Sequence, residues 1–205
     1  MHEKIQKFFE EFATEEYQKG EMIIFANMNL KSVYYIESGT VIEYDIAPSG
    51  TRAILNTFKP HAFFPISNAI NEIDTPYFYE ASGPVTVRKA PALAVVEFIK
   101  KNPDVAYDLL RRIYRGTDGV LARLSEMMRG DAESRVLKEI DIIKKRFGFE
   151  VVDNGAEQLI KKVPEKELAE RTGLARETVS RAIKKLKTSG QLKIQKGYII
   201  ISNSK

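Results

Sequence analysis

The sequence predicts an α+β chain in which an antiparallel β-barrel or sandwich comes first and mainly helical segments follow. Seven or so short runs of β-branched and aromatic residues lie within residues 22–96, separated by turns that contain Gly, Pro and Ser. From Pro103 onward, apolar residues recur at steps of three and four, which is the spacing of a helix. Two short strand-like runs separated by a Lys-Gly turn close the chain.

The composition is that of an ordinary globular protein, and it excludes several kinds of site. The chain has 205 residues, 43% of them hydrophobic, and no cysteine. A disulfide scaffold, a thiolate zinc site, an iron–sulfur cluster and a cysteine nucleophile are therefore excluded. No apolar run approaches the roughly 18 residues of a membrane span, and the first residues lack a signal-peptide core. We expect a cytoplasmic protein without membrane contact.

The charge is distributed unevenly along the chain. Residues 1–130 contain 15 Lys and Arg against 17 Asp and Glu, whereas residues 131–205 contain 17 against 11. Such asymmetry indicates that one part of the chain meets a polyanion, although a lysine-rich solvated surface gives the same count.

The N-terminal part is expected to contain one short helix and seven strands. Apolar residues at helical spacing predict an amphipathic helix over residues 3–12. The period then changes to two, and the predicted strands cover residues 22–25, 33–37, 40–46, 52–58, 77–81, 85–89 and 93–96.

A long helix is predicted to begin at Pro103, a residue suited to the first helical turn. Its apolar residues form a narrow stripe that is typical of a seam between two helices, so we expect a homodimer. A helix lying on its own β domain gives a similar stripe. Gly116 and Gly119 weaken the helix by about 1 kcal/mol each relative to Ala, so a bend is expected there. The predicted dimer stripe consists of Leu109, Ile113, Gly116, Val120, Leu124 and Met127.

Gly130 and Asp131 interrupt this helical pattern. Asp131 is predicted to cap a new helix over residues 132–147, which Gly148 ends. We therefore expect a boundary near residues 129–131. The predicted parts are a β domain over residues 1–102, a dimerisation helix with its hinge over residues 103–130, and a C-terminal domain over residues 131–205.

Residues 164–187 have the pattern of two short helices that cross through a tight turn, which Gly173 supplies. A hairpin over residues 191–201 follows. This order predicts a winged helix-turn-helix, whose second helix enters the DNA major groove. The alternative is a small helical hairpin with an exposed basic face. The predicted inner-face residues are Leu168, Ala169, Leu174, Val179, Ile183 and Leu186.

The other face of the second helix carries side chains of the kinds that bind DNA. Arg pairs with guanine, Glu accepts a hydrogen bond from cytosine, and Lys and Ser hold phosphate. This face consists of Arg176, Glu177, Ser180, Arg181, Lys184 and Lys185, and Lys193 and Lys196 lie near the predicted wing.

Three runs within this motif are specific to one family. They are Glu-Leu-Ala at 167–169, Thr-Gly-Leu at 172–174 and, above all, Arg-Glu-Thr-Val-Ser-Arg at 176–181. The chain resembles the Crp/Fnr family of bacterial transcription regulators. The resemblance implies a double-stranded β-helix, or jelly-roll, effector domain for residues 20–96, a dimerisation helix for 103–129 and a hinge at 131–135. Pro164 departs from the family, in which Thr or Ser usually caps the first helix.

The resemblance also implies roles for individual residues. Arg176, Glu177 and Arg181 match base-reading positions of the helix 176–187, and Ser180 matches a further base contact. Arg176 favours a palindromic operator with TGTGA-like half-sites. Relatives contact RNA polymerase at the place of residues 149–156. The expected phosphate contacts are Thr178, Lys184, Lys185, Lys193 and Lys196.

The residues by which the family binds cyclic nucleotides are missing. That pocket needs a Gly-Glu pair for the ribose and an Arg with Ser or Thr for the cyclic phosphate. This chain has Pro65-Ile66 and Thr75-Pro76 at the matching places, and residues 53–87 contain no arginine. A phosphate buried there would carry an uncompensated charge. We therefore expect no cyclic AMP and, with no cysteine and only His61 in the barrel, no iron–sulfur cluster or haem.

Aromatic residues at strand spacing occupy the region of the missing pocket. Such residues are usually core, but they also suit the wall of an apolar ligand pocket. On this second interpretation, the effector pocket is formed by Phe63, Phe64, Tyr77, Tyr79, Val120 and Leu121.

The residues leave three functions open. The first is a homodimeric regulator in which an effector moves the hinge at residues 128–131 and shifts the dimer between two arrangements. The second is a constitutive DNA-binding protein with a vestigial sensor domain. The third is a cupin-like enzyme, whose metal needs two or three histidines and a carboxylate. Because the β domain offers only His61, we expect neither a metal site nor an enzyme.

Overall fold

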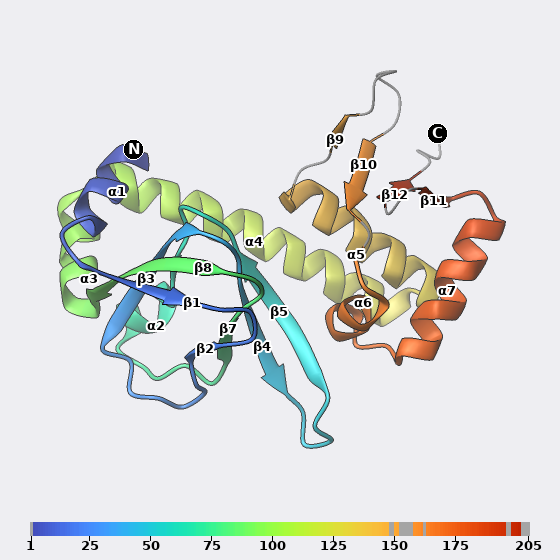
Figure 1. Cartoon of the computed structure of the whole chain (residues 1–205), viewed down its shortest axis with the longest axis horizontal. Coiled ribbons are helices and arrows are strands. Elements are labelled where there is room, and N and C mark those ends of the chain that lie inside the picture. Colours follow the sequence, from blue (N-terminus) through green and yellow to red (C-terminus); the bar gives the residue numbers. More distant parts are fainter. Residues whose placement is uncertain (1, 148–149, 152–157, 162, 196–197, 202–205) are drawn as a thin grey trace. The chain divides into compact units, whose positions relative to one another are not determined.

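The computed structural model describes residues 2–147, 150–151, 158–161, 163–195 and 198–201 of the chain. The chain forms two compact units, Met1–Ile113 and Tyr114–Lys205 (Figure 1). Helix α4 (Pro103–Arg129) begins at Pro103, as predicted, and runs from the first unit into the second. The division of the chain at residues 102 and 130 stays a prediction. Among the helices of the described part, none is long and apolar enough to cross a bilayer.

Two antiparallel four-stranded sheets form the first unit, which confirms the predicted β domain. Their strand orders are β1-β8-β3-β6 and β2-β7-β4-β5. Apolar side chains of both sheets, such as Ile36 and Phe64 of the first and Tyr79 of the second, pack into one buried cluster. The strands are β1 (Ala13–Tyr17), β2 (Met22–Ile24), β3 (Ser32–Ser38), β4 (Val41–Ile46), β5 (Arg52–Phe58), β6 (Phe63–Phe64), β7 (Phe78–Ala81) and β8 (Val85–Pro91).

Three short helices pack on the outer face of the first sheet. Successive strand residues point to opposite faces. Tyr34 of β3 therefore packs between the sheets, while Val33 and Tyr35 pack against the helices. The ring of Phe9 stacks on that of Tyr35, with 4.9 Å between centroids. The helices are α1 (His2–Phe9), α2 (Ile66–Asn71) and α3 (Ala92–Lys101).

The predicted strand over residues 93–96 is wrong, because this segment lies in helix α3. Val95 and Ile99, one helical turn apart, are buried, whereas Leu93 is 74% exposed. A short apolar run fits a strand and a helix equally well, and its packing partners decide between them. The first helix ends at Phe9 rather than at residue 12. Strands β1 and β6 and helix α2 have no counterpart in the prediction.

Three further helices and a small antiparallel sheet form the second unit together with the end of α4. Their core joins Val136 and Ile140 of α5, Leu168 of α6, and Val179 and Leu186 of α7. The sheet order is β11-β12-β10-β9. The hairpin β11-β12 confirms the prediction, whereas β9 and β10 have no counterpart in it. The elements are α5 (Ala132–Phe147), β9 (Glu150–Val151), β10 (Gln158–Lys161), α6 (Glu165–Thr172), α7 (Arg176–Thr188), β11 (Leu192–Gln195) and β12 (Tyr198–Ile201).

Asp131 caps helix α5, as predicted. Its Oδ1 accepts a hydrogen bond from the backbone N–H of Ser134 at 2.8 Å. This bond holds the pKa of the Asp131 carboxyl below its ordinary value. Gly148, the predicted end of the helix, lies outside the described residues.

Candidate nucleic-acid interface

Helices α6 and α7 meet at a tight turn, and their inner faces are buried. Gly173 ends α6 with φ at +66°, a left-handed conformation that favours glycine, and its N–H donates to the carbonyl of Ala169. The predicted inner-face residues Leu168, Val179 and Leu186 are at most 2% exposed. They pack with α5 in one core, which fixes the face that α7 presents to solvent.

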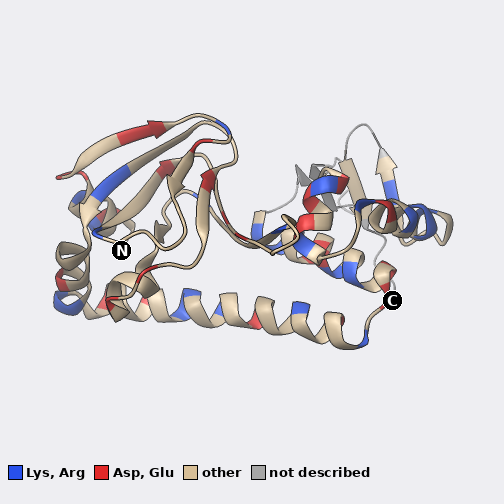
Figure 2. Ribbon diagram, turned by 90° about the horizontal axis from the view of Figure 1, so that it is seen from below, with Lys and Arg blue, Asp and Glu red and all other residues tan. Residues whose placement is uncertain are grey.

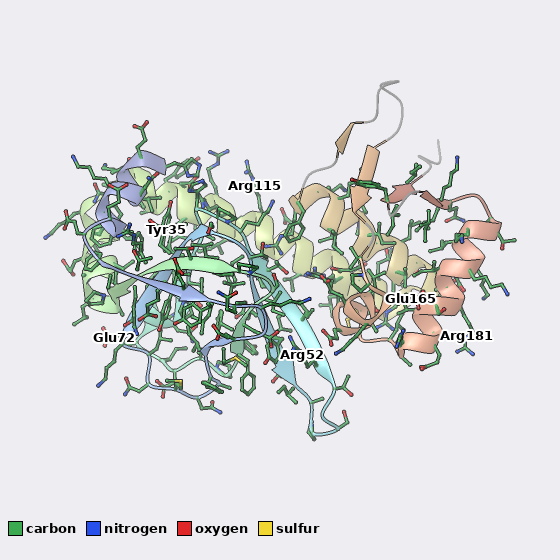
Figure 3. All side chains as sticks on the ribbon, in the orientation of Figure 1. Tyr35, Arg52, Glu72, Arg115, Glu165 and Arg181 are labelled. Atoms are coloured by element: carbon green, nitrogen blue, oxygen red, sulfur yellow. The ribbon has the colours of Figure 1, made fainter. Side chains whose placement is uncertain are left out.

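The predicted base-reading residues lie on one exposed face of α7. Arg176, Glu177, Ser180 and Arg181 are all exposed, and their spacing places them one helical turn apart in two pairs. Nη2 of Arg181 donates to Oγ1 of Thr178 at 3.2 Å. Figure 3 shows Arg181 projecting outward from the helix. This face offers two guanidinium groups, a carboxylate and a hydroxyl to a facing molecule.

The lysines predicted to contact phosphate differ in their surroundings. Lys184 and Lys193 are exposed, and Figure 2 shows bands of Lys and Arg along α7. Lys185 instead reaches α5, where its Nζ lies 2.8 Å from Oε1 of Glu133. The hydrogen bond to Glu133 raises the pKa of the Lys185 ammonium. Lys196 lies outside the described residues.

The aromatic residues of the predicted effector pocket are not gathered at one place. Phe64 stacks on Tyr79 at 5.3 Å and on Phe58 at 5.2 Å between ring centroids, and these rings fill the space between the sheets. Tyr77 packs at the edge of this cluster. Phe63 belongs to the other cluster, beneath helices α1, α2 and α3. The remaining two residues, in the second unit and 56% and 55% exposed, are Val120 and Leu121.

His61 is an exposed residue with partners at both its ring and its backbone. Its Nδ1 lies 2.8 Å from the hydroxyl of Tyr35, and its carbonyl accepts a hydrogen bond from Nη1 of Arg112 at 3.1 Å. The ring of His2 lies 5.5 Å away between centroids. Within the described ranges, no three His, Asp or Glu side chains form a group that could hold a metal ion.

Two family models match most of this chain. The cyclic nucleotide-binding domain matches residues 14–102, and the Crp-like helix-turn-helix domain matches residues 134–205. The chain belongs to the Crp/Fnr family of transcription regulators. It is therefore a DNA-binding regulator, with a cyclic-nucleotide-binding-like β domain and a C-terminal helix-turn-helix.

Individual Crp/Fnr proteins are distant relatives. The chain is 26% identical over 192 residues to the anaerobic regulatory protein of Haemophilus influenzae, which covers 91% of this chain and 71% of that protein. It is 25% identical over 175 residues to a CRP-like cAMP-activated global transcriptional regulator of Mycobacterium tuberculosis, which covers 84% and 76%. Its fold is similar to that of the c-di-GMP responsive global regulator CLP of Xanthomonas campestris, with a TM-score of 0.80 and 15% identity over 100% of both chains.

A part-buried carboxylate lies on the inner face of the β domain of this Crp/Fnr protein. Glu43 is paired in register with Tyr79 on one neighbouring strand and with Asn56 on the other, so the three share a face. The hydroxyl of Tyr79 donates to Oε1 of Glu43 at 2.7 Å. Burial raises the pKa of Glu43 and that of Tyr79. A phosphate beside Glu43 would add a second buried negative charge.

Replacing Glu43 with Gln is expected to change how stability depends on pH. The pKa of Glu43 in the folded chain lies above its ordinary value of 4.5, so the folded state holds this proton more tightly than the unfolded state does. The resulting stabilisation is complete below pH 4.5 and is lost as the pH rises through the folded-state pKa. Urea unfolding at a series of pH values should show the wild type losing free energy of unfolding relative to Glu43→Gln above pH 4.5. A pH-independent difference would contradict this.

A cluster of charged side chains joins three helices of the second unit, and the sequence analysis does not predict it. Glu139 of α5 is 1% exposed and accepts hydrogen bonds from Arg123 of α4 at 2.6 and 2.8 Å. Arg171 of α6 lies 3.8 Å from the same carboxylate and donates to Glu167 at 2.8 Å. Burial, with Arg123 and Arg171 close by, lowers the pKa of Arg146. This Glu139 cluster ties the end of α4 to α5 and to the first helix of the helix-turn-helix.

Proposed function

We propose that the chain is a homodimeric, sequence-specific transcription regulator, and not an enzyme, which reads a palindromic TGTGA-like operator through helix α7. The observation that carries this proposal is the exposed face of α7, where Arg176, Glu177, Ser180 and Arg181 lie above a buried inner face. Its DNA binding is modulated by an effector other than cyclic AMP.

The chemistry of this face supports a role in reading bases. Each guanidinium presents a fork of donors that matches O6 and N7 of guanine, and the carboxylate of Glu177 accepts from N4 of cytosine. The hydrogen bond from Arg181 to Thr178 joins two side chains of this helix. Thr178, Lys184, Lys193 and Lys196 are the proposed phosphate contacts. Lys185 would have to leave Glu133 to join them.

Selection of bound sequences from random DNA tests the proposed function. A symmetric dimer presents two recognition helices, so the selection should recover a palindrome whose half-site centres are one DNA turn, about 34 Å, apart. Recovery of TGTGA-like half-sites would support the assignment of Arg176 as a guanine reader. Failure to enrich any palindrome would overturn the proposal.

Replacing Arg181 with Ala is expected to weaken operator binding by about 1–3 kcal/mol and to relax the preference at one base position. Lys184→Ala is the matched control, since this exposed side chain on the same helix is assigned to phosphate. It should weaken operator and random DNA alike. Equal losses on both DNAs for Arg181→Ala, measured by fluorescence anisotropy, would rule out base reading by Arg181.

The exposed apolar stripe of α4 supports the dimer. Ile113, Val120, Leu124 and Met127 are 49%, 56%, 49% and 58% exposed. In Figure 2, α4 is the long helix along the lower edge, and its ribbon is mostly uncharged between narrow charged bands. A contiguous apolar surface of this kind marks an interaction site. Leu109 of the predicted stripe packs on the β domain, beside the cluster that α1 and α3 cover.

Glu43 supports an effector that is not a cyclic nucleotide, since it places a carboxylate on the inner face of the β domain. The close packing of Phe58, Phe64 and Tyr79 favours the second candidate, a constitutive regulator with a vestigial sensor domain. Operator affinity measured with and without a small-metabolite extract separates the two, because a constitutive regulator is indifferent to every extract. Contact with RNA polymerase is part of the proposal; of the predicted contact loop 149–156, residues 149 and 152–156 lie outside the described residues.

A further inference from the structure

A cavity of about 180 Å³ lies in the first unit, at the segment that joins β2 to β3. Its apolar wall is formed by Ile23, Ile24, Met28 and Leu30. A cavity of about 150 Å³ with an apolar lining holds a benzene molecule. The volume therefore suits a ligand with one ring or a short alkyl chain. None of the six residues of the predicted effector pocket lines this cavity.

The polar side of the cavity carries two lysines, together with the neutral side chains of Asn29 and Ser32. Lys31 and Lys89 both line it, next to the phenol ring of Tyr34. Nζ of Lys89 donates to Oε1 of Glu15 at 3.0 Å and lies 5.6 Å from the centroid of the Tyr34 ring. An ammonium group has three N–H donors, so Lys89 retains donor capacity after bonding Glu15. Lys31 is exposed at the rim and adds a positive charge.

The cavity adjoins the core of the β domain through stacked rings. Tyr34 stacks on Phe64 at 5.7 Å and Phe64 on Tyr79 at 5.3 Å between centroids. Tyr79 in turn holds Glu43. The segment that forms the cavity wall is fixed at Asn27, whose N–H donates to the carbonyl of Thr75 at 2.7 Å. A ligand that pushes against Tyr34 therefore acts on the ring stack of the core.

We propose that this cavity binds a small amphipathic carboxylate, either an aromatic acid with one ring or a short-chain aliphatic acid. The apolar part lies on Ile23, Ile24 and Leu30. The carboxylate accepts hydrogen bonds from Lys31 and Lys89. Binding of the carboxylate at this site does not require DNA. A role of this ligand as the effector, by contrast, rests on the proposed function.

Titration of the full-length chain with benzoate and hexanoate, followed by calorimetry and by NMR, tests the site. Benzyl alcohol, hexanol and hexylamine are the matched probes of similar shape without the negative charge. A charge-assisted hydrogen bond is about twice as strong as a neutral one, so the acids should bind at least about tenfold more tightly than the alcohols. Equal affinity of acids, alcohols and amine would overturn the proposal.

Variants locate the binding. Lys31→Gln should reduce the affinity for the acids and leave that for the alcohols unchanged, whereas Lys7→Gln, at an exposed lysine of α1, should change neither. Met28 is 49% exposed, so Met28→Trp narrows the cavity without disturbing the core and should abolish binding of all probes. Circular dichroism confirms that each variant is folded. Acid affinities that are the same in all three variants place the binding elsewhere and overturn the proposal.

The regulatory role is measured separately from the binding. Operator affinity is determined with and without saturating benzoate in the wild type and in Met28→Trp. A change confined to the wild type supports the effector role. Benzoate that binds and leaves operator affinity unchanged overturns that role alone. A failure of the DNA selection overturns the proposed function but does not contradict the carboxylate-binding site.

Discussion

Glu139→Ala is expected to lower the free energy of unfolding by about 3–5 kcal/mol, because it leaves the buried Arg171 and the part-buried Arg123 without their shared carboxylate. Arg123 loses its two hydrogen bonds to Glu139, and Arg171 loses a neighbouring negative charge. The desolvation of a guanidinium is then no longer offset by a facing carboxylate. Unfolding in urea, followed by far-ultraviolet circular dichroism, measures the effect.

Asp141→Ala is the matched control for this change. Asp141 lies on the same helix and pairs with Lys145 at 2.8 Å, but that lysine is 71% exposed. A surface ion pair of this kind contributes about 0–1 kcal/mol. Glu139→Gln, which keeps the shape and one acceptor, should fall between the two. If Glu139→Ala costs no more than Asp141→Ala, the Glu139 cluster does not hold the second unit together.

A double change of Val120 and Leu124 to Asp is expected to convert the proposed dimer into a monomer. Both side chains lie on the exposed stripe of α4, and four carboxylates would meet in the seam between two copies. Operator affinity should then fall by about 10²- to 10⁴-fold, since binding of the second half-site is no longer an intramolecular event. Analytical ultracentrifugation and fluorescence anisotropy measure the two effects.

Leu93→Asp controls for the introduction of a charge at an exposed leucine. Leu93 is 74% exposed on α3, away from the α4 stripe. The Leu93→Asp variant should leave the sedimenting mass and the operator affinity unchanged. A Val120→Asp/Leu124→Asp protein that still sediments as a dimer would show that the copies associate through another surface.

The sequence predicts best those features that depend on short-range pattern. The alternation in residues 40–46 and 52–58 marks two strands, and the inner-face spacing of residues 164–187 marks the two helices and their glycine turn. Residues 93–96 mislead because four apolar residues in a row carry no period. Strand β1, with the sequence Ala-Thr-Glu-Glu-Tyr, forms through its pairing with β8, which a local pattern does not contain. Pro164 is the N-cap residue before α6 and makes no side-chain capping hydrogen bond, because proline has no side-chain acceptor.

The residues of the candidate site also differ in how well the sequence predicts them. Exposure of Arg176 and Arg181 follows from the helical period, because the opposite face is apolar. The Glu139 cluster joins residues from three helices, so no residue spacing along the chain predicts it. One signal exists: Glu139 stands directly beside Ile140 and within the stripe that Val136 and Ile143 define. A charged residue at such a place needs a partner, and its identity depends on the tertiary fold.

The ion pair between Lys185 and Glu133 has a consequence for the thermodynamics of DNA binding. Lys185 is already paired with the carboxylate of Glu133. It can therefore displace condensed ions from DNA only if that ion pair breaks first. Each phosphate neutralised on duplex DNA contributes about −0.9 to the slope of log affinity against log salt. This slope reports the number of ions that are released on binding, and not the number of basic residues in the protein. For this protein, the dependence of operator affinity on salt should therefore be shallower than the basic residues of helix α7 suggest.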